Sequence, residues 1–243
     1  MSELPARSNA LRNYLAYAIL IACLVGVHFI LAANPGAARS AAQAAVFSWP
    51  WLGAIAALGL LGVVFLNLTP LRGLWDRDLG IGAKLFWPLL AGLALGAVNV
   101  GEDLATHWSR HMAAEMHLPS IHIAWPLSAP IYFGGAILVS IAYFFVLLPF
   151  LYWLIACLWL KGRGEAAVYW IIGSLLALVE PLTQGDLHEI AQGGTAAVPG
   201  AVCDLLLNFG QVWLLRRAGL VAAIALRVGY YAVWHVLYGL ISP

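Results

Sequence analysis

The stretch GLVAAIALRVGYYAVWHVLYG, residues 219–239, is long and apolar enough to cross a bilayer, yet it carries Arg227, Tyr231 and His235. About 20 helical residues span the ~30 Å hydrocarbon core of a membrane. The three polar residues recur at every fourth position, so they share one face of such a helix. A charge near the bilayer centre costs about 2.5–3.5 kcal/mol unless it is paired or solvated. The stretch therefore predicts a membrane-spanning helix whose polar face points into a bundle.

The whole chain has the composition of an integral membrane protein. Of its 243 residues, 63% are hydrophobic and only 9% are charged, which is outside the range of soluble domains. This composition makes a lipid bilayer the expected surroundings. The formal net charge of +1 gives no electrostatic basis for binding nucleic acid. Long apolar runs lie at 14–33, 51–68, 85–101, 126–160, 166–183, 197–215 and 219–241. They predict an all-α, polytopic membrane helix bundle of seven transmembrane helices, forming a single domain over residues 1–243.

The run 126–160 has room for one long tilted helix or for two short helices broken at Pro149. Loop lysines and arginines separate the two cases, because they concentrate on the cytoplasmic side of a membrane. A single crossing leaves only Arg39 and Arg110 on one face. It gathers on the other face Arg7, Arg12, Arg72, Arg77, Lys84, Lys161, Arg163, Arg216 and Arg217. Two crossings would remove this bias, so we expect one helix here and a cytoplasmic N-terminus.

Further polar residues lie inside the fifth and sixth predicted spans. Glu180 is in the fifth, and the sixth carries Asp204, Asn208 and Gln211 on one helix face. We expect this face to meet the polar face of the last span inside the bundle. Two interpretations are open: a water-accessible cavity for catalysis, ligand binding or proton movement, or interhelical hydrogen bonds that hold the spans together.

Residues 215–238, LRRAGLVAAIALRVGYYAVWHVLY, resemble the last motif of the CAAX-protease and bacteriocin-processing (CPBP) family of intramembrane glutamic proteases. In that family the helix carries His, Asp and His at intervals of four residues. The same positions here are Arg227, Tyr231 and His235, so only the last histidine is kept.

The other motifs of the family are altered as well. The segment IYFGGAILVSIAYFFVLLPFLYWLI, 131–155, is similar to the one that carries Glu-Glu-x-x-x-Arg, but it has Val139 and Ser140 at the glutamates and Phe144 at the arginine. The segment LALVEPL, 176–182, is similar to the Phe-x-x-x-His motif, with Leu176 at the phenylalanine and Glu180 at the histidine. The resemblance covers about residues 119–240. It implies the helical fold of that family without its protease chemistry, because valine and serine cannot act as a general base.

The resemblance also suggests a contact inside the former catalytic centre. One motif histidine is replaced by an acid, Glu180, and another by a base, Arg227, so the two could form a buried ion pair between the fifth and seventh spans. If all spans start at one level, however, Glu180 would lie about 10 Å nearer the outer face than Arg227. Asp204 or His235 would then be closer in height, although shifts of two to four residues in the span boundaries and helix tilt could close much of the gap.

The most polar stretch, GEDLATHWSRHMAAEMHLPSIHIAW at 101–125, falls outside the membrane. In one continuous helix Asp103, His107, His111 and Glu115 would share a face, and such imidazole and carboxylate ligands suit zinc or another divalent metal. The alternative is an amphipathic helix at the membrane interface with its polar face in water. No other cofactor is expected.

Two functions are compatible with these features. The first is a non-catalytic relative of the family that serves as a membrane subunit, assembly factor or scaffold partner in a larger complex. The second is a divergent protease or hydrolase that uses Glu180 and His235, or a metal at the outer histidines. The altered motifs favour the first, with a membrane protein as partner, and the resemblance implies the bacterial inner membrane.

Overall fold

The chain forms a bundle of long helices in the computed structural model, which describes residues 7–37, 44–76, 78–115, 117–183, 190 and 198–241. These residues include no strand. Within the described ranges, seven helices are long and apolar enough to cross a membrane: Ala10–Ala33, Trp49–Asn67, Gly82–Thr106, Ser128–Trp159, Glu165–Leu182, Val198–Arg217 and Leu220–Leu240. The prediction of an all-α bundle with seven membrane-spanning helices is confirmed.

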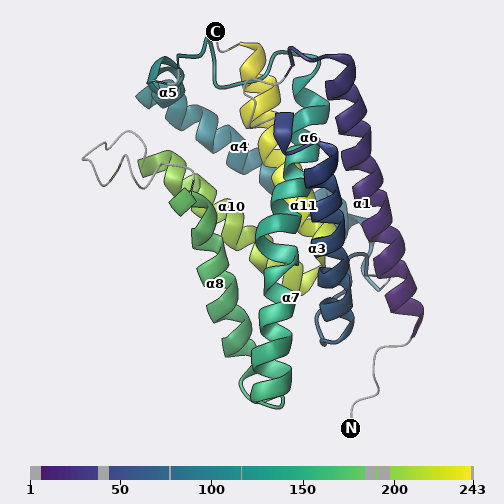
Figure 1. The fold of residues 1–243 in the computed structure, drawn as a ribbon. Helices are drawn as coiled ribbons and strands as arrows, with labels where there is room; N and C mark the ends of the chain where they lie inside the picture. Colours follow the sequence, from purple (N-terminus) through teal and green to yellow (C-terminus); the bar gives the residue numbers. More distant parts are fainter. Residues whose placement is uncertain are drawn as a thin grey trace.

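Successive long helices run in opposite directions (Figure 1). We therefore call the face where α1 begins the N-terminal face and the face where the last helix ends the C-terminal face. The elements are α1 (Arg7–Ala33), α3 (Trp49–Asn67), η1 (Gly82–Phe86), α4 (Trp87–Thr106), α5 (Trp108–Glu115), α6 (Ser128–Val139), η2 (Ser140–Phe145), α7 (Leu147–Tyr152), η3 (Trp153–Trp159), α8 (Glu165–Thr183), α10 (Val198–Arg217), α11 (Leu220–Tyr231), η4 (Ala232–Leu237) and η5 (Tyr238–Leu240).

The segment from α6 to η3 crosses the bundle once, as one long helix, and is not broken at Pro149. Proline has no N–H and leaves the carbonyl four residues earlier without its helical partner. That carbonyl belongs to Phe145, and a Cβ built on Gly62 of α3 would lie only 2.8 Å from its oxygen. Glycine thus lets α3 pack directly on this weakened turn. The wider π-helical turns of η2 and η3 on either side accommodate the change in backbone bonding.

Helices α4 and α11 cross with their backbones in contact. A Cβ on Gly92 would lie 2.0 Å from the carbonyl oxygen of Leu226, and one on Gly229 would lie 2.3 Å from that of Leu89. Gly92 and Gly96 face α11 one helical turn apart, which is the small-residue spacing that brings membrane helices close together. This crossing fixes the position of α11, and with it Arg227, the residue that follows Leu226.

A turn at Gly219 connects α10 to α11. Its φ of +86° lies in a region that glycine adopts freely, and a Cβ there would lie 2.0 Å from the carbonyl oxygen of Gly73. The last residues of α10 and the first of α11 are therefore held against the 68–74 loop, and the two polar faces of these helices stand side by side.

Candidate functional site

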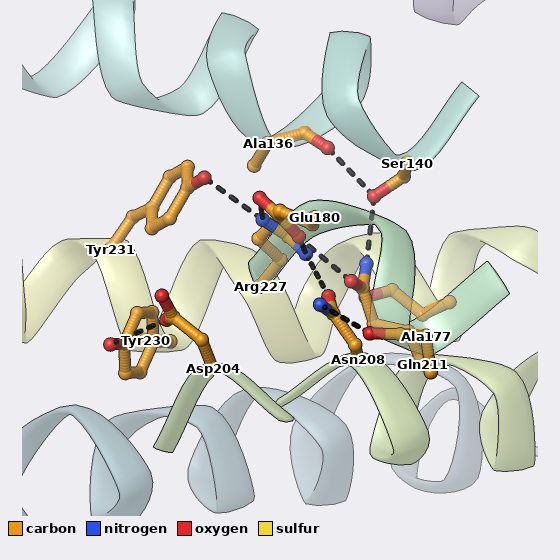
Figure 2. Close-up of polar contacts among 11 residues, drawn as sticks. Ala136, Ser140, Ala177, Glu180, Asp204, Asn208, Gln211, Arg227, Tyr230 and Tyr231 are labelled. Carbon is orange, nitrogen blue, oxygen red and sulfur yellow. Dashed lines mark hydrogen bonds and ion pairs between the residues drawn. The ribbon is translucent and has the colours of Figure 1, made fainter. Parts of the chain in front are cut away.

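Arg227 is buried in the bundle, and each of its five N–H donors has an acceptor (Figure 2). Nη1 and Nη2 donate to the two carboxylate oxygens of Glu180 at 2.7 and 2.5 Å. Nη1 also donates to the hydroxyl of Tyr231 at 3.0 Å, and Nη2 to Oδ1 of Asn208 at 2.5 Å. The remaining donor, Nε, reaches Oε1 of Gln211 at 2.9 Å.

The amide groups around the guanidinium are themselves held by further hydrogen bonds. Nε2 of Gln211 donates to Ser140 Oγ at 2.8 Å and to the Ala223 carbonyl at 3.1 Å. Ser140 in turn donates to the Ala136 carbonyl at 2.7 Å. We call this set the Arg227 network; it joins η2, α8, α10 and α11 and consists of Ser140, Glu180, Asn208, Gln211, Arg227 and Tyr231.

The ion pair within the network is almost completely removed from solvent. Glu180 is 3% exposed and Arg227 is 1% exposed. Two charges in such surroundings are tolerated when they neutralise each other and when their remaining hydrogen-bonding groups are satisfied. Removing one partner would leave the other as an isolated buried charge. The ion pair therefore ties α8 to α11, and substituting either charged residue alone is unfavourable.

The expected difference in height between Glu180 and Arg227 is wrong, because their side chains are in direct contact. That difference assumes that all spans begin at one level. In Figure 1 the turn between the long helix and α8 extends beyond the turn between α10 and α11. Helix α8 therefore starts further from the centre of the bundle, which brings Glu180 to the level of Arg227.

Asp204 and His235 hold positions beside the network, toward the C-terminal face. Oδ1 of Asp204 accepts a hydrogen bond from Tyr230 at 3.1 Å. The ring of His235 is stacked on Tyr132, with centroids 4.1 Å apart, and its Nδ1 lies 3.3 Å from Nδ1 of His122. The prediction that the polar faces of α10 and α11 meet is confirmed most directly by Asn208 and Gln211, which bind Arg227.

A cavity of about 250 Å³ brings the intramembrane candidates together. Its lining includes all five of them: Glu180, Asp204, Arg227, Tyr231 and His235. Glu102 and Asp103 from α4 add two carboxylates to the same wall. The polar residues thus form hydrogen bonds between helices and also line a polar cavity, and the ion pair in its wall links α8 to α11.

The metal-site hypothesis rested on a continuous helix through residues 103–115, and that premise is wrong. Helix α4 ends at Thr106, and His107 has a left-handed backbone with φ of 55° before α5 begins. Asp103 is buried, where it accepts hydrogen bonds from Ser109 and Tyr238, whereas the side chains of His107, His111 and Glu115 are exposed. Across the described ranges no three His, Cys, Asp or Glu residues are grouped to hold a metal ion.

Two partners of His235 were not identified from the sequence. His122 reaches His235 from a loop more than one hundred positions earlier, and Tyr132 stacks on the same ring. Spacing within one helix carries no signal for such contacts. Tyr238, which binds Asp103, follows Tyr231 by seven residues and continues its helix face, so periodicity could have placed it there.

Four positions that the sequence resemblance assigned to motif residues lie together in the network: Ser140, Glu180, Arg227 and Tyr231. No protein-family model, curated protein or solved structure matches the chain.

Proposed function

We propose that this chain is a non-catalytic relative of the CPBP intramembrane proteases and acts as a membrane subunit, assembly factor or scaffold in the bacterial inner membrane. The observation that carries the proposal is the double hydrogen bond from Arg227 to both carboxylate oxygens of Glu180. A general base has to be oriented on the water or group whose proton it takes. Glu180 instead serves as the counter-ion of a buried guanidinium, and moving it toward a substrate would leave that charge uncompensated.

The arrangement of the network supports a common origin with the family. Residues that correspond to three separate motifs, on η2, α8 and α11, converge on one point. In an active protease such convergence would surround a water molecule. Here Gln211 links the serine to the guanidinium, and the guanidinium donates directly to the carboxylate, so on this proposal the centre serves packing.

Replacing both Glu180 and Arg227 by methionine distinguishes a structural role of the ion pair from a role in catalysis or ligand binding. Apolar replacement of a buried ion pair is often neutral for stability. We therefore expect E180M/R227M to retain both its partner and the cellular function measured by complementation of a deletion. Loss of function in a folded double variant would show that the charges perform chemistry or bind a ligand.

Purification in a mild detergent tests the partner itself. We expect a membrane protein to co-purify in fixed stoichiometry with the wild type and with E180M/R227M. The control is another tagged seven-helix membrane protein at equal expression, which should not carry that partner. A chain that elutes alone, both before and after chemical cross-linking in the membrane, would contradict the subunit proposal.

A divergent hydrolase is the second candidate, because Glu180, Asp204 and His235 share one cavity. It requires that purified protein cleave membrane-embedded peptides and that His235→Ala abolish the cleavage. We expect no difference between wild type and His235→Ala in such an assay.

A further inference from the structure

A second polar cavity, of about 430 Å³, lies at the N-terminal face. We call it the N-terminal cavity. It is formed where the N-terminal part of α1, the end of α7, the first turn of α8, the last turn of α10 and residues 70–76 and 78 come together. Its charged lining residues are Arg72, Asp76, Asp78, Glu165 and Arg216. None of these belongs to the Arg227 network.

Arg216 lines this cavity, and one nitrogen of its guanidinium lacks a hydrogen-bond partner among the described residues. Its Nη1 is buried and has no hydrogen-bond partner in the described part of the chain. The guanidinium carbon lies 4.9 Å from the ring centre of Tyr169 and 5.9 Å from that of Trp170, so aromatic rings flank it. A buried charged donor without an acceptor is costly. Such a group is suited to an anionic ligand.

The other charges of the cavity are largely engaged or lie at its rim. Arg72 forms an ion pair with Asp76, and Lys84 donates to the carbonyl of Asp76 at 2.9 Å. Asp78 is exposed, and Glu165 lies beside the Tyr152 hydroxyl. Partial burial raises the pKa of Asp76, but a hydrogen bond from the Asp78 backbone and the nearby Arg72 and Lys84 outweigh it, and the net pKa is lowered. The carboxylate of Asp76 is therefore charged at neutral pH.

The balance of charges indicates the class of ligand. Two arginines and three carboxylates line the cavity. A free dianion, such as inorganic phosphate, would gain Arg216 but would be repelled by the carboxylates. A zwitterion complements both signs of charge in the cavity, with its anionic group on Arg216 and its cationic group on the acidic residues. An ammonium with N–H donors suits carboxylates better than a quaternary ammonium, which has none.

The position of the cavity favours a lipid as the source of this zwitterion. The cavity lies at the ends of membrane-spanning helices, where headgroups are expected. Trp75, in its lining, and Trp170, beside Arg216, are each 37% exposed, as tryptophans at a membrane interface commonly are. We propose that the N-terminal cavity binds the headgroup of an ethanolamine phospholipid, with its phosphate on Arg216 and its ammonium on Glu165 or Asp78.

Thermal unfolding of the full-length protein in detergent tests this site with short-chain phospholipids as probes. A ligand that binds only the folded state raises the unfolding temperature in proportion to its occupancy. We expect dihexanoyl phosphatidylethanolamine to stabilise the wild type more than phosphatidylcholine, phosphatidylglycerol or inorganic phosphate does. In Arg216→Gln its affinity should fall by about tenfold, the effect of losing a charge-assisted hydrogen bond.

Arg217→Gln is the matched control, because Arg217 is the next residue of the same helix end but is exposed and lies against Trp213. It should bind the ethanolamine lipid like the wild type. Equal stabilisation by all three lipids, an equal effect of inorganic phosphate, or equal binding by the two variants would overturn the proposal. The comparison of lipids on the wild type decides the matter even if Arg216→Gln does not fold.

Discussion

Replacing Arg227 by methionine is expected to lower the free energy of unfolding by about 3–5 kcal/mol, the usual cost of breaking a buried ion pair. The substitution removes five hydrogen bonds and leaves Glu180 as a buried, uncompensated carboxylate. Reversible unfolding of the purified protein in mixed micelles measures this loss. A large decrease in folded protein recovered from membranes should accompany it.

Arg217→Met, at the end of α10, serves as the control for the loss of one positive charge near the turn that precedes α11. The side chain of Arg217 is exposed, so this variant should stay within about 0.5 kcal/mol of the wild type. If both methionine variants were equally stable, the guanidinium of Arg227 would not be holding the bundle together.

Gly92→Ala is expected to be the second most damaging change, with a loss of about 1–3 kcal/mol from overpacking. The new Cβ would lie 2.0 Å from the carbonyl oxygen of Leu226, which is backbone and cannot swing away. Helices α4 and α11 would have to separate. Because Arg227 follows Leu226 in the chain, this separation would also displace Arg227. The same unfolding measurement therefore reports both on the crossing and on its support of the network.

Gly101→Ala is the matched control on the same helix. A Cβ there meets nothing within 4 Å, and alanine is the better helix former, so stability should be unchanged or slightly higher. Equal losses at Gly92 and Gly101 would show that helix propensity, and not close approach, determines the outcome.

The sequence contains enough information for the spans but not for the heights at which they start. Apolar runs and loop charges were sufficient to predict seven spans, including the single crossing of 126–160, because hydropathy and length act locally. The level of Glu180 relative to Arg227 depends instead on how far each hairpin extends from the bundle centre (Figure 1). This extension is determined by packing between helices, and the periodicity of polar residues within a single helix carries no information about it.

The candidate site shows the same division. The faces carrying Asn208, Gln211 and Arg227 were predicted to meet, since four-residue spacing places polar groups on one side of a helix. The break at His107 was not predicted, because it occurs without a glycine or proline. Asp103 stabilises the break by accepting hydrogen bonds from the backbone and side chain of Ser109. From the sequence alone, an aspartate at that position is equally compatible with a place on the surface.

A double-mutant cycle on Glu180 and Arg227 tests the central claim most directly. The four proteins are the wild type, E180M, R227M and E180M/R227M, and the quantity measured is the free energy of unfolding of each. We expect each single variant to lose about 3–5 kcal/mol and the double variant to recover most of that loss, with a coupling energy of at least about 2 kcal/mol. Losses that simply add in the double variant would contradict an ion pair that holds α8 and α11 together.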